Sequence, residues 1–202
     1  MTTWVEPEGG RERGLWGLAK SFTQVLVNPG GFFREAVSPG DQAPGLAFGM
    51  TVVLLEESTR LALHPAAALD FPTADWLAAL LTVALAVLLV TPAAIHALSA
   101  VQTLALVAVA PDRGGVSETV QVIAYAAAPC VLAGVGVPAV TAIATLWSFA
   151  LLVYGTSVVH EISLPRAFAA AVVPGALAFG SGFGGIAAAE ALADAAATAL
   201  AL

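Results

Sequence analysis

The stretch from Trp76 to Pro111 constrains this chain more than any other, because it contains no Asp, Glu, Lys or Arg. His96 is its only titratable side chain. As one continuous helix it would rise roughly 54 Å, compared with a bilayer hydrocarbon core of about 30 Å. A backbone in lipid must satisfy its own hydrogen bonds, and a helix does so internally. The stretch therefore predicts an all-α, polytopic transmembrane helical bundle whose first partner is the lipid bilayer.

The composition points the same way. Of 202 residues, 59% are hydrophobic and 10% are charged, whereas an average soluble domain has about 25% charged residues. The formal net charge is −7, and the absence of a basic patch argues against a nucleic-acid partner. This length accommodates one membrane domain and leaves no room for a separate catalytic domain.

The N-terminal region divides into a polar part and an amphipathic part. Residues 1–14 are predicted to form a flexible polar tail without the features of a cleaved signal peptide. Residues 15–42 are predicted to be an interfacial segment. Within it, 15–27 has apolar residues at helical spacing, with Trp16 suited to the headgroup level, and 32–37 is a second amphipathic piece. Both pieces are too short to span, so they are expected to lie on the membrane.

Residues 43–190 are predicted to form a five-span domain, followed by a C-terminal tail at 191–202. The second span is longer than the bilayer requires, so it must tilt, bend at Pro92 or project beyond the membrane. A split at Thr91-Pro92 into two spans is the alternative. It is disfavoured because it would place Arg113 on the side that lacks positive charge. The predicted spans are 43–63, 76–97 with an extension to 110, 119–134, 138–159 and 167–189.

The distribution of Arg and Lys among the short segments outside the spans predicts the orientation. Segments with cations alternate with segments that have none, from the N-terminus to the C-terminal tail. This alternation predicts a multi-pass protein of the cell membrane with the N-terminus in the cytoplasm and the C-terminus outside. The cations are Arg11, Arg13, Lys20 and Arg34 before the first span, Arg113 between the second and third, and Arg166 between the fourth and fifth.

Several short motifs follow one another along the chain. They are Pro29-Gly-Gly-Phe-Phe-Arg34 before the spans, Tyr125-Ala-Ala-Ala-Pro129 in the third span, Tyr154-Gly155 and His160 at the end of the fourth, and Arg166-Ala167 before the fifth. Together with five spans, this order resembles the Yip domain family (Ypt-interacting proteins) in its prokaryotic form. The resemblance covers about residues 28–190.

The resemblance implies a five-span membrane protein. Eukaryotic members of the family are linked to small Rab-type GTPases and vesicle traffic, and carry a Gly-Tyr-x-Leu-x-Pro-like motif in the third span. Tyr125 and Pro129 match the Tyr and Pro of that motif, whereas Ala124 and Ala127 replace its Gly and Leu. The Asp-Leu-x-Gly-Pro segment that precedes the first span in those members has no match here, which argues against a Rab-type partner.

Three charged residues within the first span form the clearest candidate site. Glu56 lies roughly 20 Å along a helix that begins at Ala43, and an ionisable group at that depth is costly unless it is paired or hydrated. Glu56 and Arg60 have the i, i+4 spacing of a helical ion pair. One interpretation is a proton, ion or substrate site that includes Glu57. The other is a structural Glu56–Arg60 pair near the outer interface, with Glu57 reaching the headgroups.

His96 is expected near the inner end of the second span, four residues after Pro92. It is interpreted either as a structural histidine that bonds a free carbonyl or as a proton-relay partner of the acidic site. The three histidines, His64, His96 and His160, lie in different segments and lack a metal-binding spacing. We therefore predict no metal site and no cofactor.

Two pairs of glycines have the spacing that lets helices approach closely, Gly45 with Gly49 and Gly180 with Gly184. Packing within the bundle is the first interpretation, and a homo-oligomer is the second. The sequence shows no catalytic set of side chains, so we predict no enzyme. The leading hypothesis is a membrane-organising scaffold that recruits a protein partner on its cytoplasmic face. The alternative is a small ion, proton or solute transporter or channel that uses Glu56 and Glu57.

Overall fold

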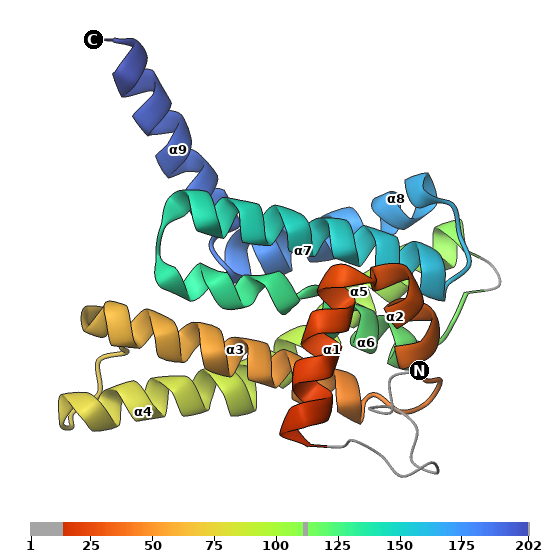
Figure 1. The fold of residues 1–202 in the computed structure, drawn as a ribbon, viewed down its shortest axis with the longest axis horizontal. Coiled ribbons are helices and arrows are strands. Elements are labelled where there is room, and N and C mark those ends of the chain that lie inside the picture. The colour runs from red at the N-terminus through yellow and green to blue at the C-terminus, as the bar shows by residue number, and fades with distance from the viewer. Residues whose placement is uncertain (1–13, 111–112, 202) are drawn as a thin grey trace.

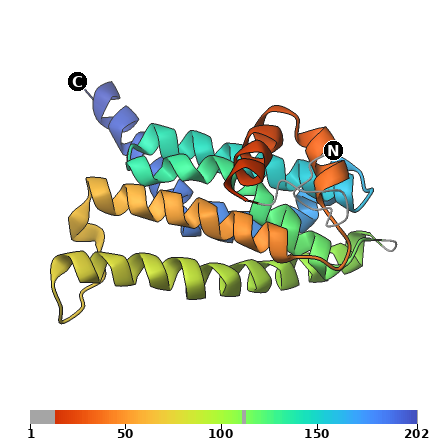
Figure 2. The same ribbon diagram turned by 60° about the horizontal axis from the view of Figure 1, so that its bottom comes forward.

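A computed structural model describes residues 14–110 and 113–201. Within these ranges the chain is helical and contains no β-strand. Five antiparallel passes lie side by side along the long axis of the molecule, and a short N-terminal helix crosses them near the middle (Figures 1 and 2). Residues 1–13, which include most of the predicted polar tail with Arg11 and Arg13, lie outside the described ranges.

The five passes contain both regular and irregular helix. The first pass is α3 (Ala43–Leu63), and the fourth is α7 (Pro138–Val159). The other three change helix type partway along. They are α4 (Asp75–Leu85), η2 (Ala86–Val90) and α5 (Thr91–Val109) in the second pass, α6 (Val116–Ala126) and η3 (Ala128–Val135) in the third, and α8 (Leu164–Gly175) and η4 (Ala176–Gly182) in the fifth.

Apolar residues cover the outside of this bundle. Within the described residues, four passes are long and apolar enough to cross a membrane: Asp75–Val109, Val116–Val135, Pro138–Val159 and Leu164–Gly182. The remaining pass, α3, has 21 residues and contains Glu56, Glu57 and Arg60. Leu88, Leu104 and Leu146 are 66%, 73% and 69% exposed. Water would not favour such a surface, whereas acyl chains would.

The second pass runs without interruption from Asp75 to Val109, so the alternative of two spans divided at Thr91-Pro92 is wrong. The pass instead contains a π-helical segment, η2, that ends just before Pro92. Proline lacks an N–H and its ring crowds the carbonyl four residues earlier, which an α-helix does not tolerate well. The wider π turn relieves this crowding, and the Thr91 hydroxyl donates to the Ala86 carbonyl at 2.7 Å.

The fifth pass differs from the helix expected over 167–189. It begins at Leu164 and ends at Gly182, and Gly184 follows with a left-handed φ of 76°. The chain then turns into α9 (Gly185–Leu200), so most of the predicted tail 191–202 is helical. Gly184 therefore breaks the chain direction and does not form a packing face with Gly180. Figure 1 shows α9 leaving the bundle at the end opposite the start of α8.

The N-terminal layer consists of α1 (Leu15–Val27) and α2 (Pro29–Ala36). Asn28 separates them because its side chain accepts a hydrogen bond from the Gly31 amide at 3.2 Å and caps α2. Proline follows at the first position of α2, where no N–H is needed. Val25, Phe32 and Phe33 are buried, whereas Leu15 and Trp16 are 86% and 73% exposed. This layer is thus docked on the bundle through one face only.

Candidate functional site

The motifs that lie far apart in the sequence meet beneath α2. The Phe33 ring packs directly on Gly155 of α7, where a Cβ atom would come within 2.7 Å of the ring. The Phe32 ring meets the Tyr125 ring edge to face, with 4.9 Å between centroids. Gly155 is therefore small because an aromatic side chain of another helix needs the space.

Tyr125 is fully buried at the centre of this contact. Its ring also packs edge to face on Phe48 of α3 at 5.1 Å, and Phe48 stacks on Phe22 of α1 at 4.3 Å. Such aromatic pairs contribute about 0.5–1.5 kcal/mol each beyond their buried area. Tyr125 thus connects the N-terminal layer to the interior of the bundle.

A pair of hydrogen bonds holds the end of the same layer. The Gln121 side chain accepts from the Ser38 amide at 3.1 Å and donates to the Ser38 carbonyl at 2.7 Å. Gln121 is fully buried, so these bonds satisfy an amide group that would be costly to leave unpaired. Gly45 packs against the backbone of Gln121, and Gly49 against Ile95 and Ala124. The Gly45–Gly49 pair is therefore used inside the bundle.

Pro129 sets the geometry of the third pass. Four residues after Tyr125, it interferes with the α-helical bond to the Tyr125 carbonyl, and the helix changes from α6 to the 3₁₀ segment η3. The narrower η3 lies against α3, and Gly134 has its Cα next to the Glu56 carbonyl, where any Cβ would overlap. The Tyr125–Pro129 spacing thus leads directly to close contact with the acidic segment of α3.

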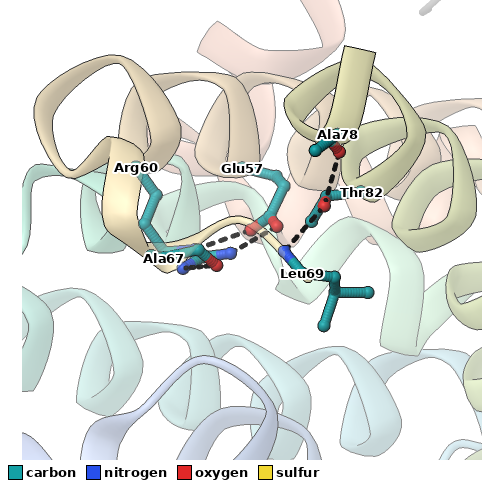
Figure 3. Close-up of polar contacts among 6 residues, drawn as sticks. All are labelled: Glu57, Arg60, Ala67, Leu69, Ala78 and Thr82. Atoms are coloured by element: carbon teal, nitrogen blue, oxygen red, sulfur yellow. Dashed lines mark hydrogen bonds and ion pairs between the residues drawn. The ribbon is translucent and has the colours of Figure 1, made fainter. Parts of the chain in front are cut away.

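Arg60 pairs with Glu57, and the predicted Glu56–Arg60 pair is wrong. Nε and Nη2 of Arg60 donate to the two carboxylate oxygens of Glu57 at 2.7 and 2.5 Å. Nη1 also donates to the Ala67 carbonyl of the short 3₁₀ turn that follows α3, at 3.4 Å (Figure 3). Glu57 is only 8% exposed, so it does not reach the headgroups. Its charge is compensated by a two-point contact, the strongest form of an arginine–carboxylate pair.

Glu56 is half-buried and has no such partner. No hydrogen bond or ion pair within the described residues engages its carboxylate. It lines two cavities that share Glu56, Glu57, Gly182 and Phe183. One has a volume of about 230 Å³ and extends into the bundle between α3, η2, α5 and η4. The other, called the outer cavity because it lies nearer the end of the bundle, has a volume of about 530 Å³ and adjoins the start of α9.

His96 is not part of this site. Its side chain is exposed on the outer face of α5, and Nδ1 lies 2.7 Å from the Pro92 carbonyl of its own helix. The neighbouring residues Ile95 and Leu98 line the inner cavity instead. The contact with Pro92 supports the structural interpretation of His96, and nothing places it within reach of Glu56.

A polar cluster that the sequence motifs do not predict surrounds His160 at the opposite end of the bundle. His160 is 2% exposed, and Nε2 lies 3.4 Å from the Thr119 hydroxyl. Burial lowers the pKa of His160 to about 4, Glu118 acts to raise it, and Arg113 acts to lower it. Nearby, the fully buried Gln102 donates to Thr156 at 2.7 Å. The burial of His160 depends on a distant segment that includes Gly114, where an added Cβ would lie 3.3 Å from Nδ1, so local spacing does not predict it.

Taken together, the apolar passes and the docked amphipathic layer define a multi-pass α-helical membrane protein. The model of the Yip1 domain family matches residues 23–186, from the middle of α1 through all five passes to the start of α9. The chain therefore belongs to the Yip1 domain family, which confirms the resemblance seen in its motifs. Searches of curated proteins and of solved structures give no match.

Proposed function

We propose that this protein is a non-enzymatic scaffold that organises the membrane and recruits a protein partner on the cytoplasmic face. The observation that carries the proposal is the docking of α1 and α2. The shared motifs position this layer through Phe33 on Gly155 and Phe32 on Tyr125. These contacts fix the position of the layer and leave Leu15 and Trp16 exposed. The layer therefore presents a defined surface to lipid headgroups and to a partner.

The charge distribution supports the cytoplasmic assignment of this face. Lys20 lies in α1, Arg34 in α2, Arg113 in the connection before α6, and Arg166 in the first turn of α8, all toward the same end of the bundle. Among the described cations only Arg60 lies near the other end, and Glu57 pairs with it. Positively charged segments are retained in the cytoplasm during membrane insertion. This orientation places the N-terminus inside and the C-terminus outside the cell membrane.

Photo-crosslinking tests the scaffold. A photoreactive amino acid replaces Trp16, which is exposed on α1, and in a second variant Leu146, which is equally exposed on α7. In intact cells we expect a discrete protein adduct at position 16 and none at position 146. The same adducts at both positions, or lipid adducts alone at both, would contradict recruitment by this layer.

A transporter is the second candidate, and the cavities at Glu56 favour it specifically. Glu56 lies where the inner and outer cavities meet. Toward the cytoplasmic end, the buried rings of Phe48 and Tyr125 fill the interior, so any transport would require this packing to open. Proteoliposomes containing wild type or Glu56→Gln decide between the two functions. Ion or proton flux that Glu56→Gln abolishes would replace the scaffold with the transporter.

A further inference from the structure

The two cavities at Glu56 differ in chemistry in a way that suits one kind of ligand. Apart from Glu56 and Glu57, the inner cavity has a single polar residue in its lining, Thr91. The Thr91 hydroxyl is already used by the Ala86 carbonyl. An apolar cavity of this kind excludes water and accepts hydrocarbon. The outer cavity also contains Arg60, Thr141 and Ser181, so it can hold water or a polar group.

The charges at the boundary between the cavities do not cancel. Arg60 is the only Lys or Arg in either lining, and both oxygens of Glu57 engage it. When ionised, the carboxylate of Glu56 therefore carries a negative charge that no side chain of either lining compensates. In surroundings this apolar, such a charge is stable only beside a cation or when it takes up a proton.

Irregular helical segments with small side chains form part of the wall of the inner cavity. Two π-helical segments, η2 and η4, face it from the second and fifth passes and contribute Ala86, Val90, Ala178 and Gly182. A π turn widens the helix and is frequently found at functional sites. Gly134 presses η3 against the backbone of Glu56, which fixes this residue at the boundary between the two cavities.

We infer that these cavities form a binding site for an amphiphilic monocation. An alkyl chain occupies the inner cavity, and an ammonium group attached to it pairs with Glu56 at the boundary. A free single-chain amine and the headgroup amine of an aminophospholipid share this chemistry. The inference does not depend on the scaffold role, because binding at Glu56 and recruitment by α1 concern different parts of the bundle.

Native mass spectrometry in a maltoside detergent, which carries no charge, tests the site with octylammonium as the probe. We expect one bound octylammonium per chain, and at least tenfold weaker binding of octanol, which has the same chain without the charge. Glu56→Gln should lower the affinity for octylammonium at least tenfold and leave octanol unchanged. Glu190→Gln, which changes an exposed acid of α9 outside both linings, should bind as wild type does.

A second variant tests the chain-binding half of the site. Ala178→Leu fills the inner cavity and should weaken octylammonium and octanol alike. Added phosphatidylethanolamine identifies the source of the ligand, because it displaces the probe if the site takes lipid and leaves it bound if the site takes free amines. Equal binding of octylammonium to wild type and Glu56→Gln, or equal affinity for octanol and octylammonium, would overturn the inference. Flux and crosslinking results would not change with it.

Discussion

Gly134 is the residue at which the backbone itself determines the acidic site. Its Cα lies against the Glu56 carbonyl, so a methyl group there has nowhere to go. We expect Gly134→Ala to reduce the free energy of unfolding by about 1–3 kcal/mol, as overpacking commonly does. Gly182→Ala is the matched control, because its nearest new neighbour would be 3.4 Å away. Thermal melts of both variants in detergent measure the difference, and equal melting temperatures would contradict this account.

At His160 the burial of an imidazole makes stability depend on pH. Its pKa is lowered from an ordinary value of 6.5 to about 4. The unfolded chain takes up a proton below pH 6.5 while the folded protein does not, so acid favours unfolding. We expect the free energy of unfolding to fall by up to about 3 kcal/mol between pH 6.5 and 4, and to stay level above pH 6.5.

Melts of His160→Gln across the same pH range check this prediction. In this variant the free energy of unfolding should no longer fall between pH 6.5 and 4, even if its value at neutral pH is lower. His64 is exposed, so His64→Gln should keep the pH dependence of the wild type. Glu118 acts to raise the pKa of His160, so Glu118→Gln should lower that pKa further and extend the fall in the free energy of unfolding to lower pH. A pH dependence that survives in His160→Gln would assign the acid sensitivity to other groups.

The choice of partner for Arg60 shows what residue spacing can and cannot predict. Glu56 and Glu57 stand four and three residues before Arg60, and both spacings permit a helical ion pair. The two carboxylates point about 100° apart around the helix, so packing on each side decides between them. The contact of Gly134 with the Glu56 backbone and the loop carbonyl of Ala67 beside Arg60 come from distant segments. A single-sequence pattern contains neither contact.

At the scale of elements, the docking of α2 on α7 depends on one small residue. Gly155 receives the Phe33 ring, and a Cβ atom would lie 2.7 Å from it. We expect Gly155→Ala to displace α2 and to increase hydrogen exchange in 15–36, while the five passes keep their protection. The double variant Gly155→Ala with Phe33→Leu should recover part of that protection, because the smaller side chain makes room. Uniform loss of protection throughout the bundle would contradict this local role.

Helix type within a pass is harder to predict than the presence of the pass. Apolar runs indicate the passes directly, because lipid requires helices of that length. Pro92 predicts an irregularity in the second pass, but the sequence alone does not decide between a bend, a tilt and a split into two spans. In the structure the irregularity is a π turn. After the fifth pass, the chain turns at Gly184, whose φ is 76°. Nothing in the sequence distinguishes this glycine from the others nearby. Each outcome depends on neighbouring helices that no local window includes.

Across the whole molecule, the odd number of passes puts the start of α3 and the end of the fifth pass at opposite ends of the bundle. The connection between α7 and α8, which contains Ser163, lies toward the end where α2 docks, whereas the connection between α3 and α4, which contains Thr73, and α9, which contains Thr198, lie toward the other end (Figures 1 and 2). The chain has one cysteine, Cys130, and it is buried. Cysteines introduced at these three positions can therefore be labelled individually.

An impermeant maleimide applied to intact cells should label Thr73→Cys and Thr198→Cys and leave Ser163→Cys unlabelled until the membrane is opened. The reason is that the described cations other than Arg60 collect toward the Ser163 end, and cytoplasmic retention of such segments orients the bundle. The reverse pattern would keep five passes and invert the protein, which would move the α1 surface away from any cytoplasmic partner. Labelling of Thr198→Cys and Ser163→Cys from the same side would instead mean that the fifth pass, formed by α8 and η4, does not cross the membrane. The first pass, α3, is the most costly to insert, because it contains Glu56, Glu57 and Arg60. The Glu57–Arg60 pair reduces that cost, so Arg60→Gln should shift the Thr73 position toward the unlabelled state if α3 inserts only marginally.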